Sequence, residues 1–191
     1  MASFGLHLLV AEEYLKLHKI DGVEEFIKGN FAPDMVEDKV ASHYSIYNKT
    51  MSYTDTLKNK VDLVQYVKHN DIDSDFKKGE FYHLFTDYVF YTQYVIHLGT
   101  YKKLAKANTG NLNEELYTEY NRLMHWIKQN YNLQYLSMIP SDYCIERDES
   151  MQLFDGESIK RVVNYLADID IDMVYNLIKN TKGKFSLKLK F

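Results

Sequence analysis

The chain is poor in the residues that break or cross-link a polypeptide. It has two prolines, eight glycines and one cysteine in 191 residues. Because Gly and Pro are the strongest punctuators of local structure, their scarcity favours long helices. The lone Cys144 cannot form an internal disulfide and lies outside any Cys-rich metal pattern, so we expect a partly buried, small apolar side chain there.

The chain also lacks a surplus of positive charge and a long apolar run. Its net charge of −4 and pI of about 6.0 argue against a protein that binds the nucleic-acid backbone. No segment reaches the ~18 apolar residues of a membrane-spanning helix, and the N-terminus shows neither the basic nor the apolar region of a signal peptide. We therefore expect a cytoplasmic protein without a transmembrane segment.

What the chain has is enough apolar sequence for one sizeable core. Hydrophobic residues make up 46% of it and charged residues 26%, as in ordinary globular domains. The length fits a single domain. We place this domain at residues 1–183, followed by a tail at 184–191 in which apolar and polar residues alternate. The tail is an edge strand, a segment that docks on a protein partner, or a disordered end, and we favour the last two.

The spacing of apolar residues and the capping residues predict most of the helices. The predicted helices are Ser3–His18, Tyr53–Lys68, Ser74–Ala107 with a kink or break near Gly99, Leu112–Gln129, Ser158–Ala167 and Ile171–Lys179. Ser3 and Asp170 are the expected N-caps of the first and last of these. A turn is predicted at Asn108–Asn113.

Between the first two long helices we expect a short helix at Val23–Lys28 and then a loop. Gly29 and Asn30 can supply a left-handed exit from a helix, and Pro33 disfavours a helical conformation at the residue before it. Asp34 would then stand on a stiff loop that continues irregularly through Tyr44. Loops of this length are often functional rather than plain connectors.

The sequence from Phe81 to Asp87 holds the clearest candidate site. His83 and Asp87 are four residues apart, so they share one face of a helix. That helix is otherwise apolar, and burying an unpaired charge is costly. Either a shared cation or a mutual hydrogen bond would explain the pair. Gly79, one turn earlier, would let another helix approach closely. His7, taken alone, is best explained as a hydrogen-bonded core histidine.

Four segments together resemble a known family. They are the first helix with His7, the run Gly29-Asn30-Phe31-Ala32-Pro33-Asp34, the run Ser42-His43-Tyr44, and the run from Gly79 to Asp87. In this order they resemble the zinc-dependent phospholipase C and S1/P1 nuclease superfamily, and most closely its small bacterial phospholipase C-like proteins. The resemblance covers roughly the first half of the chain.

The resemblance implies an all-α, single-domain helical bundle with a central metal pocket. It matches His43, His83 and Asp87 to the ligands of one zinc, and His7 with Asp87 to part of a second, so that Asp87 would bridge. Asp34 matches the carboxylate that contacts the first metal and positions or deprotonates the attacking water. The implied substrate is a small phosphoester or a molecule derived from a phospholipid.

The chain departs from the family at two points. Active members carry an N-terminal Trp that binds metal, whereas this chain begins Met-Ala and has Trp only at position 126. Their further His and HxxxE pair have no counterpart after Asp87. We therefore expect one zinc site and part of a second, and we carry three interpretations forward. The first is a zinc-dependent phosphoester hydrolase. The second is a non-catalytic module, with a structural metal or none, that binds a protein partner through its tail or its Tyr-rich surface. The third is a bundle whose His and Asp residues are only hydrogen-bonded.

Overall fold

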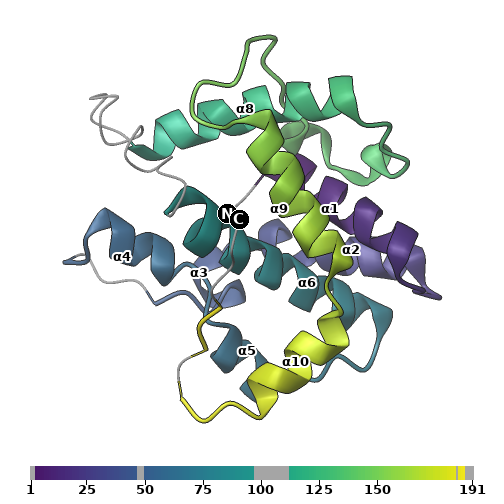
Figure 1. Ribbon diagram of the computed structural model, residues 1–191, viewed down its shortest axis with the longest axis vertical. Coiled ribbons are helices and arrows are strands. Elements are labelled where there is room, and N and C mark those ends of the chain that lie inside the picture. Colours follow the sequence, from purple (N-terminus) through teal and green to yellow (C-terminus); the bar gives the residue numbers. More distant parts are fainter. Residues whose placement is uncertain (1–2, 47–49, 97–111, 184, 188–191) are drawn as a thin grey trace.

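Helices from the first half of the chain lie at the middle of the molecule, with other helices around them (Figure 1). The computed structural model describes residues 3–46, 50–96, 112–183 and 185–187. These residues form helices and connecting loops, with no strand among them, in one compact domain. The predicted all-α, single-domain fold is thus confirmed. Within the same residues, no helix combines the length and the apolar character needed to cross a bilayer.

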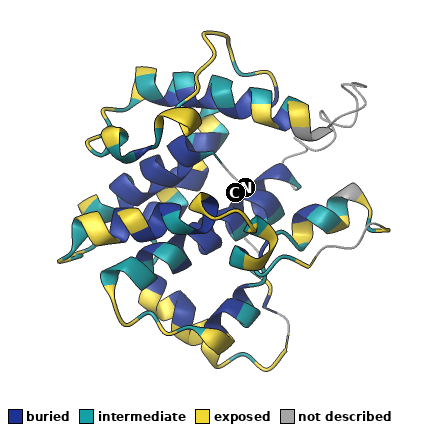
Figure 2. Ribbon diagram, turned by 180° about the vertical axis from the view of Figure 1, so that it is seen from behind, coloured by how far each residue is buried: buried dark blue, intermediate teal, exposed yellow. Residues whose placement is uncertain are grey.

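Helix α1 (Phe4–Leu17) lies in the interior, and its residues from Phe4 to Glu12 are all buried. Its predicted cap is present, because Ser3 Oγ accepts a hydrogen bond from the Leu6 N–H at 3.2 Å. Figure 2 shows continuous burial along the central helices and exposure along the outer ones. A helix buried on all sides can hold polar residues only where they find partners.

The prediction of a loop at Gly29–Asp34 was wrong. Helix α2 (Val23–Met35) runs through this segment and includes Pro33. Packing against α6 (Asp75–Val89) explains the difference. A Cβ on Gly29 would lie 2.0 Å from the Phe76 carbonyl oxygen, and one on Gly79 would lie 2.0 Å from the Phe26 carbonyl oxygen. The two glycines therefore allow a close crossing of α2 and α6, as predicted for Gly79 alone.

Two further predictions about the segment between α2 and α6 were wrong. The residues predicted to be irregular include a one-turn helix, α3 (Lys39–Ser42). The single helix predicted at Tyr53–Lys68 is two helices, α4 (Tyr53–Lys58) and α5 (Leu63–His69). The break has a local cause, because the Asp62 carboxylate accepts from the Gln65 N–H at 3.0 Å and starts a new helix.

After Val89 the helix continues as a π-helical turn, η1 (Phe90–Val95). The long helix predicted from Ser74 is thus confirmed in its first part, with Ser74 as its N-cap. The predicted break near Gly99 and the end at Ala107 lie outside the described residues, as does most of the predicted turn at Asn108–Asn113. A π-helical turn shifts the register of the side chains that follow it.

The second half of the chain packs around the central helices. Helix α8 (Leu112–Asn130) lies across one end of the molecule, and α9 (Gly156–Asp168) crosses in front of α1 and α6 (Figure 1). Short 3₁₀ turns, η2 (Leu136–Met138) and η3 (Ser141–Tyr143), occupy the connection between them. Helix α10 (Ile171–Lys179), with the predicted cap Asp170, packs against α5 at the other end.

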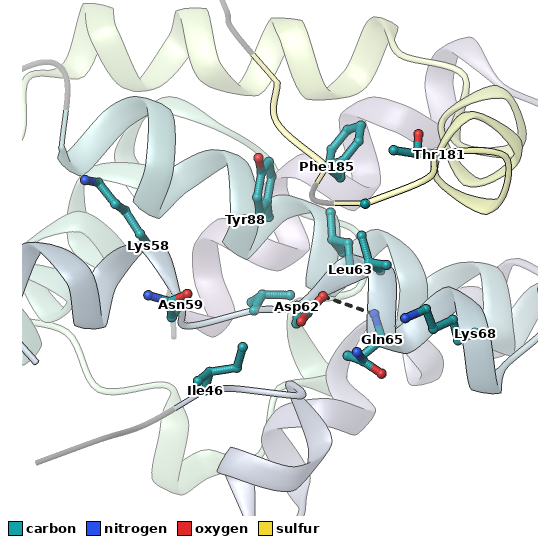
Figure 3. A pocket seen from close by; sticks show the side chains of 13 residues that line it. Ile46, Lys58, Asn59, Asp62, Leu63, Gln65, Lys68, Tyr88, Thr181 and Phe185 are labelled. Carbon is teal, nitrogen blue, oxygen red and sulfur yellow. Dashed lines mark hydrogen bonds between the residues drawn. The ribbon is translucent and has the colours of Figure 1, made fainter.

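The described part of the C-terminal segment is packed onto the domain. The Phe185 side chain is 9% exposed, and its ring lies 5.6 Å from that of Tyr88. The Leu187 N–H donates to the Tyr88 hydroxyl at 3.3 Å. Residues 185–187 are therefore neither a strand nor a free end. Beside them is a cavity of about 350 Å³, with Lys58 and Lys68 toward opposite ends of it (Figure 3).

Candidate metal centre

Five buried polar side chains from four segments converge at the crossing of the central helices. They are His7 on α1, Asp34 near the end of α2, His43 directly after α3, and His83 with Asp87 on α6. Each is at most 2% exposed. All five residues predicted from the sequence are thus brought together, and they form two groups that could hold a metal ion.

The backbone of α2 sets the orientation of His83. Its Nδ1 lies 2.6 Å from the Asn30 carbonyl oxygen. Because a carbonyl oxygen only accepts, Nδ1 carries the hydrogen, and in the neutral ring Nε2 keeps a lone pair. Burial lowers the pKa of His83 well below its usual value, and the neighbouring His7 lowers it further. At neutral pH the ring is therefore uncharged, with its free lone pair aimed at the centre of the cluster.

The backbone of α3 orients His43 in the same way. Its Nδ1 lies 2.9 Å from the Lys39 carbonyl oxygen and 2.9 Å from Ser42 Oγ. The Ser42 hydroxyl in turn donates to the Pro33 carbonyl at 2.8 Å, which ties α3 to α2. Nδ1–H donates to the Lys39 carbonyl, so His43 also presents Nε2 to the cluster. Ligand histidines are usually held by this kind of contact to the second nitrogen.

The two histidines face each other with like atoms. His43 Nε2 lies 3.1 Å from His83 Nε2. When both rings are neutral and carry their hydrogen on Nδ1, neither Nε2 can donate, and two lone pairs oppose each other. A cation between them removes this conflict. Without a cation, one of the two rings must carry a hydrogen on Nε2, either as an imidazolium or as the other neutral tautomer.

Two carboxylates complete the group around these nitrogens. His43 Nε2 is 3.4 Å from Asp87 Oδ2 and 3.5 Å from Asp34 Oδ1. His83 Nε2 is 4.0 Å from Asp87 Oδ2 and 3.9 Å from Asp34 Oδ1. Ligand atoms about 2.0–2.1 Å from a tetrahedral ion are roughly 3.3–3.4 Å apart. The shorter separations already fit one shared ion.

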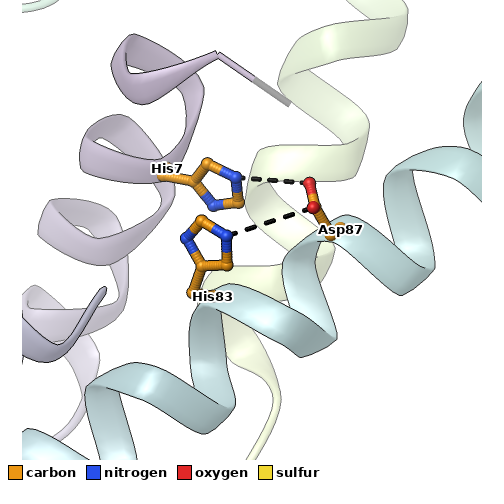
Figure 4. A group of neighbouring side chains, drawn as sticks. All are labelled: His7, His83 and Asp87. Atoms are coloured by element: carbon orange, nitrogen blue, oxygen red, sulfur yellow. Dashed lines mark ion pairs between the residues drawn. The ribbon is translucent and has the colours of Figure 1, made fainter. Parts of the chain in front are cut away.

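His7 extends the cluster on its other side (Figure 4). Its Nε2 lies 3.3 Å from Asp87 Oδ1, and its ring stacks on that of His83 with centroids 3.8 Å apart. The two oxygens of Asp87 therefore face different imidazoles, Oδ1 toward His7 and Oδ2 toward His43 and His83. A carboxylate in this position can bridge two cations.

The pKa values of the two carboxylates are shifted in opposite directions. Burial raises the pKa of Asp34, and the negative charge of Asp87 raises it further, against the opposing effect of His7 and His43. Burial also acts to raise the pKa of Asp87, but the contacts from His43 and His7 help hold it well below its usual value. Asp87 therefore favours its anionic form, whereas Asp34 is better suited to take up a proton.

Several buried polar atoms of this region have no hydrogen-bond partner among the described residues. They include Asp34 Oδ1, Nδ1 of His7 and the side-chain amide of Asn30. Such groups are costly to bury, because water would otherwise satisfy them. The donor set of imidazoles and carboxylates, together with these unpaired atoms, fits a bound divalent metal.

Three of the contacts that build the site were missed from the sequence. The Asn30 and Lys39 carbonyls and the Ser42 hydroxyl all orient ligand imidazoles. Backbone carbonyls leave no residue-type signal, so Asn30 and Lys39 could not be recognised. Ser42 stood directly before His43, which was the only available hint.

One side of the cluster meets a surface cavity of about 320 Å³, which we call the Asp34 cavity. Asp34 is at its buried end, and aromatic residues from α1, α8 and η3 form much of its lining. The cavity of Figure 3, by contrast, contains one carboxylate, Asp62, which is used to cap α5. Where a metal pocket was expected, the described residues form a buried cluster of imidazoles and carboxylates, and its Asp34 side meets this cavity.

Comparisons with known proteins add no relative: no family model, no curated protein and no solved structure matches this chain.

Proposed function

We propose that the protein is a zinc-dependent hydrolase of phosphoesters. One observation supports this most strongly. Two imidazole nitrogens, each freed by a backbone hydrogen bond at the other ring position, face each other at 3.1 Å beside two buried carboxylates. Neutral imidazoles with carboxylates are a donor set that zinc prefers.

In this proposal His43, His83, Asp87 and Asp34 surround the first zinc. His7 and the second oxygen of Asp87 offer a partial second site. When bound, zinc supplies Lewis acidity toward a phosphoryl oxygen and lowers the pKa of a water toward neutrality. The chain itself contributes fixed ligand directions, because three helices and the α3 backbone hold the donors before any ion arrives.

Asp34 is the proposed general base. It is the carboxylate of the cluster that reaches the Asp34 cavity, and its raised pKa favours proton uptake. A carboxylate oxygen of Asp34 accepts a proton as the water oxygen bonds to phosphorus. The P–O bond to the alcohol then breaks, and the proton can pass to the departing oxygen. For a monoester the products are an alcohol and inorganic phosphate, so atoms and charge balance.

Metal content tests the first half of the proposal. Protein purified without a His tag is reconstituted with zinc, freed of loosely bound metal and analysed by elemental mass spectrometry. We expect at least one zinc per chain, and a His83→Asn variant should bind less. A stoichiometry near zero for the wild-type protein would favour the purely hydrogen-bonded interpretation.

Hydrolysis tests the second half. Zinc-loaded wild type and Asp34→Asn are assayed on phosphomonoesters and phosphodiesters, with Asp73→Asn, an exposed carboxylate outside the site, as control. We expect Asp34→Asn to lose about 100-fold or more in rate, as typical for a general base, and Asp73→Asn to keep the wild-type rate. Equal rates for Asp34→Asn and wild type would exclude the role of Asp34. Bound zinc without hydrolysis would favour the non-catalytic module.

A further inference from the structure

The Asp34 cavity shows more than access to the metal cluster. Its lining includes Asp34 at the buried end, Lys39, a second carboxylate, Asp142, and the aromatic residues Phe4, Tyr117, Tyr120 and Tyr143. Its volume of about 320 Å³ is near the low end for small-molecule sites, which span about 300–1,000 Å³. This space suits a small ligand and would leave the acyl chains of a phospholipid outside.

The aromatic lining comes in two pairs from separate parts of the chain. Phe4 on α1 packs against Tyr143 of η3, with centroids 4.5 Å apart and an interplanar angle of 32°. Tyr117 and Tyr120 on α8 meet edge to face at 6.1 Å and 84°. Tyr143 is 43% exposed and Tyr117 58% exposed, although both are large rings. Exposed rings at the edge of a cavity provide surface for stacking on a ligand.

Lys39 is the cation of this lining. Within the described residues, no carboxylate lies within ion-pair distance of its ammonium group, which instead lies 5.4 Å from the centroid of the Tyr143 ring. Its backbone carbonyl holds His43, so the same residue connects the cavity to the metal cluster. A lysine in this place can pair with a phosphate oxygen of a ligand whose phosphorus lies next to Asp34.

The position of Lys39 also argues against one class of ligand. Aromatic residues around a cavity can bind a quaternary ammonium group through cation–π contacts. Here the Lys39 ammonium already occupies the neighbourhood of the Tyr143 ring, and a second cation would be repelled. The lining therefore suits an anion joined to a flat ring better than it suits a choline group.

We infer that the Asp34 cavity binds a phosphomonoester of a small aromatic alcohol, with the phosphate at Lys39 and the ring against Tyr143. This inference rests on the proposed function for the orientation of the phosphate toward the metal. Lys39 is then a positioning residue for the phosphate, and Tyr143 determines the preference for a ring.

Binding of two unreactive phosphonates, and of phosphocholine as a phosphomonoester with a quaternary ammonium group, tests the inference. Zinc-loaded protein is titrated calorimetrically with phenylphosphonate, methylphosphonate and phosphocholine. We expect phenylphosphonate to bind about tenfold more tightly than methylphosphonate, the effect of one good aromatic contact. Tyr143→Leu should remove most of this preference. Lys39→Gln should weaken both phosphonates by a similar factor, about tenfold or more, and leave their ratio unchanged.

Matched controls come from other surface cavities. Lys68→Gln alters a lysine of the cavity in Figure 3, and Tyr165→Leu alters a tyrosine of α9 that lines a third surface cavity. Both should keep the wild-type affinities. Zinc content and the thermal midpoint are measured for every variant, so that a folding defect is recognised. Tyr143→Phe, which keeps the ring, should keep the preference, and its loss in that variant would contradict the role of the ring.

Equal affinity for the phenyl and methyl compounds, tightest binding of phosphocholine, or unchanged affinity in Lys39→Gln would each overturn the inference. The titrations are repeated with zinc-free protein. If the protein takes up no zinc and hydrolyses nothing, but the ring preference and its dependence on Tyr143 persist, the proposed hydrolase fails while the cavity assignment stands. If zinc binds and hydrolysis occurs without any ring preference, the cavity assignment alone fails.

Discussion

At the scale of single residues, the informative feature is the hydrogen bond that Nδ1 makes with a backbone carbonyl in two of the three histidines of the cluster. His83 donates from Nδ1 to the Asn30 carbonyl, and His43 donates from Nδ1 to that of Lys39. These contacts decide which nitrogen faces the cluster. A histidine that was merely satisfied in the core would more often use both nitrogens for hydrogen bonds.

The first residue-scale prediction concerns Ser42. Its hydroxyl contacts His43 Nδ1 and donates to the Pro33 carbonyl, so Ser42→Ala should loosen the His43 ring without removing a ligand. We expect the zinc dissociation constant to rise about tenfold, as for other partners of ligand histidines. Competition with a chromophoric chelator measures it. The exposed Ser137→Ala is the control, and an unchanged constant in Ser42→Ala would contradict the orienting role.

The second residue-scale prediction concerns pH. Because the pKa of His83 is depressed in the folded protein, its imidazole is protonated in the unfolded chain before it is protonated in the folded one as the pH falls below about 6.5. The free energy of unfolding of zinc-free protein should therefore fall with pH below that value, by up to about 1.4 kcal/mol per pH unit. Urea denaturation between pH 7.5 and 5.0 measures the slope.

Asp34 acts in the opposite sense, because its pKa is raised and the folded state holds its proton more firmly. The pH series is therefore made in an Asp34→Asn background, with and without His83→Gln. The slope should be smaller when His83 is replaced. Identical slopes in the two variants would show that His83 is not the group responsible.

At the scale of elements, the crossing of α2 and α6 positions the site. Gly29 and Gly79 remove the side chains that would keep the two helices apart. The crossing lets the Asn30 carbonyl reach His83 and places Asp34 over the same centre. Pro33 would argue for a helix end on local grounds, but α2 continues through it.

Gly79→Ala tests this crossing. The new methyl group would meet the Phe26 carbonyl, a backbone atom that cannot move aside, so we expect a loss of about 2–3 kcal/mol in unfolding free energy together with weaker zinc binding. Gly5→Ala is the matched comparison, because its closest neighbour is the flexible Met124 side chain. It should cost less and leave zinc binding unchanged. Chemical denaturation and zinc titration of both variants decide the question.

At the scale of the whole molecule, the cluster joins segments far apart in the sequence. Its donors come from α1, α2, α6 and the residue after α3, so a bound ion would link elements that separate on unfolding. A ligand at 1,000 times its dissociation constant stabilises the folded state by about 4 kcal/mol, which corresponds to roughly 10 °C in a domain of this size.

Zinc should therefore raise the thermal midpoint by roughly 10 °C, and a chelator should reverse the shift. Differential scanning calorimetry at fixed protein concentration measures both. The His83→Asn variant should show a much smaller response to zinc. Identical midpoints of wild-type protein with zinc and with chelator would argue against a metal linking these helices.

The sequence alone determined most helix positions in the second half, because capping residues and apolar spacing are local signals. The all-α class was what the family resemblance implied. The ends of α1, α8 and α10 agree closely with the prediction. The sequence alone also determined that His83 and Asp87 share one face of a helix, because residues four apart in a helix point the same way. His7, Asp34 and His43 were identified by family resemblance, and their convergence is confirmed.

Only the tertiary structure decided how α2 continues through Gly29 and Pro33, because helix packing outweighs local preference there. It also decided which ring nitrogens face the centre and which carboxylate meets the cavity. These outcomes depend on backbone carbonyls and on helices brought together from distant parts of the chain. Neither leaves a pattern in residue type or spacing.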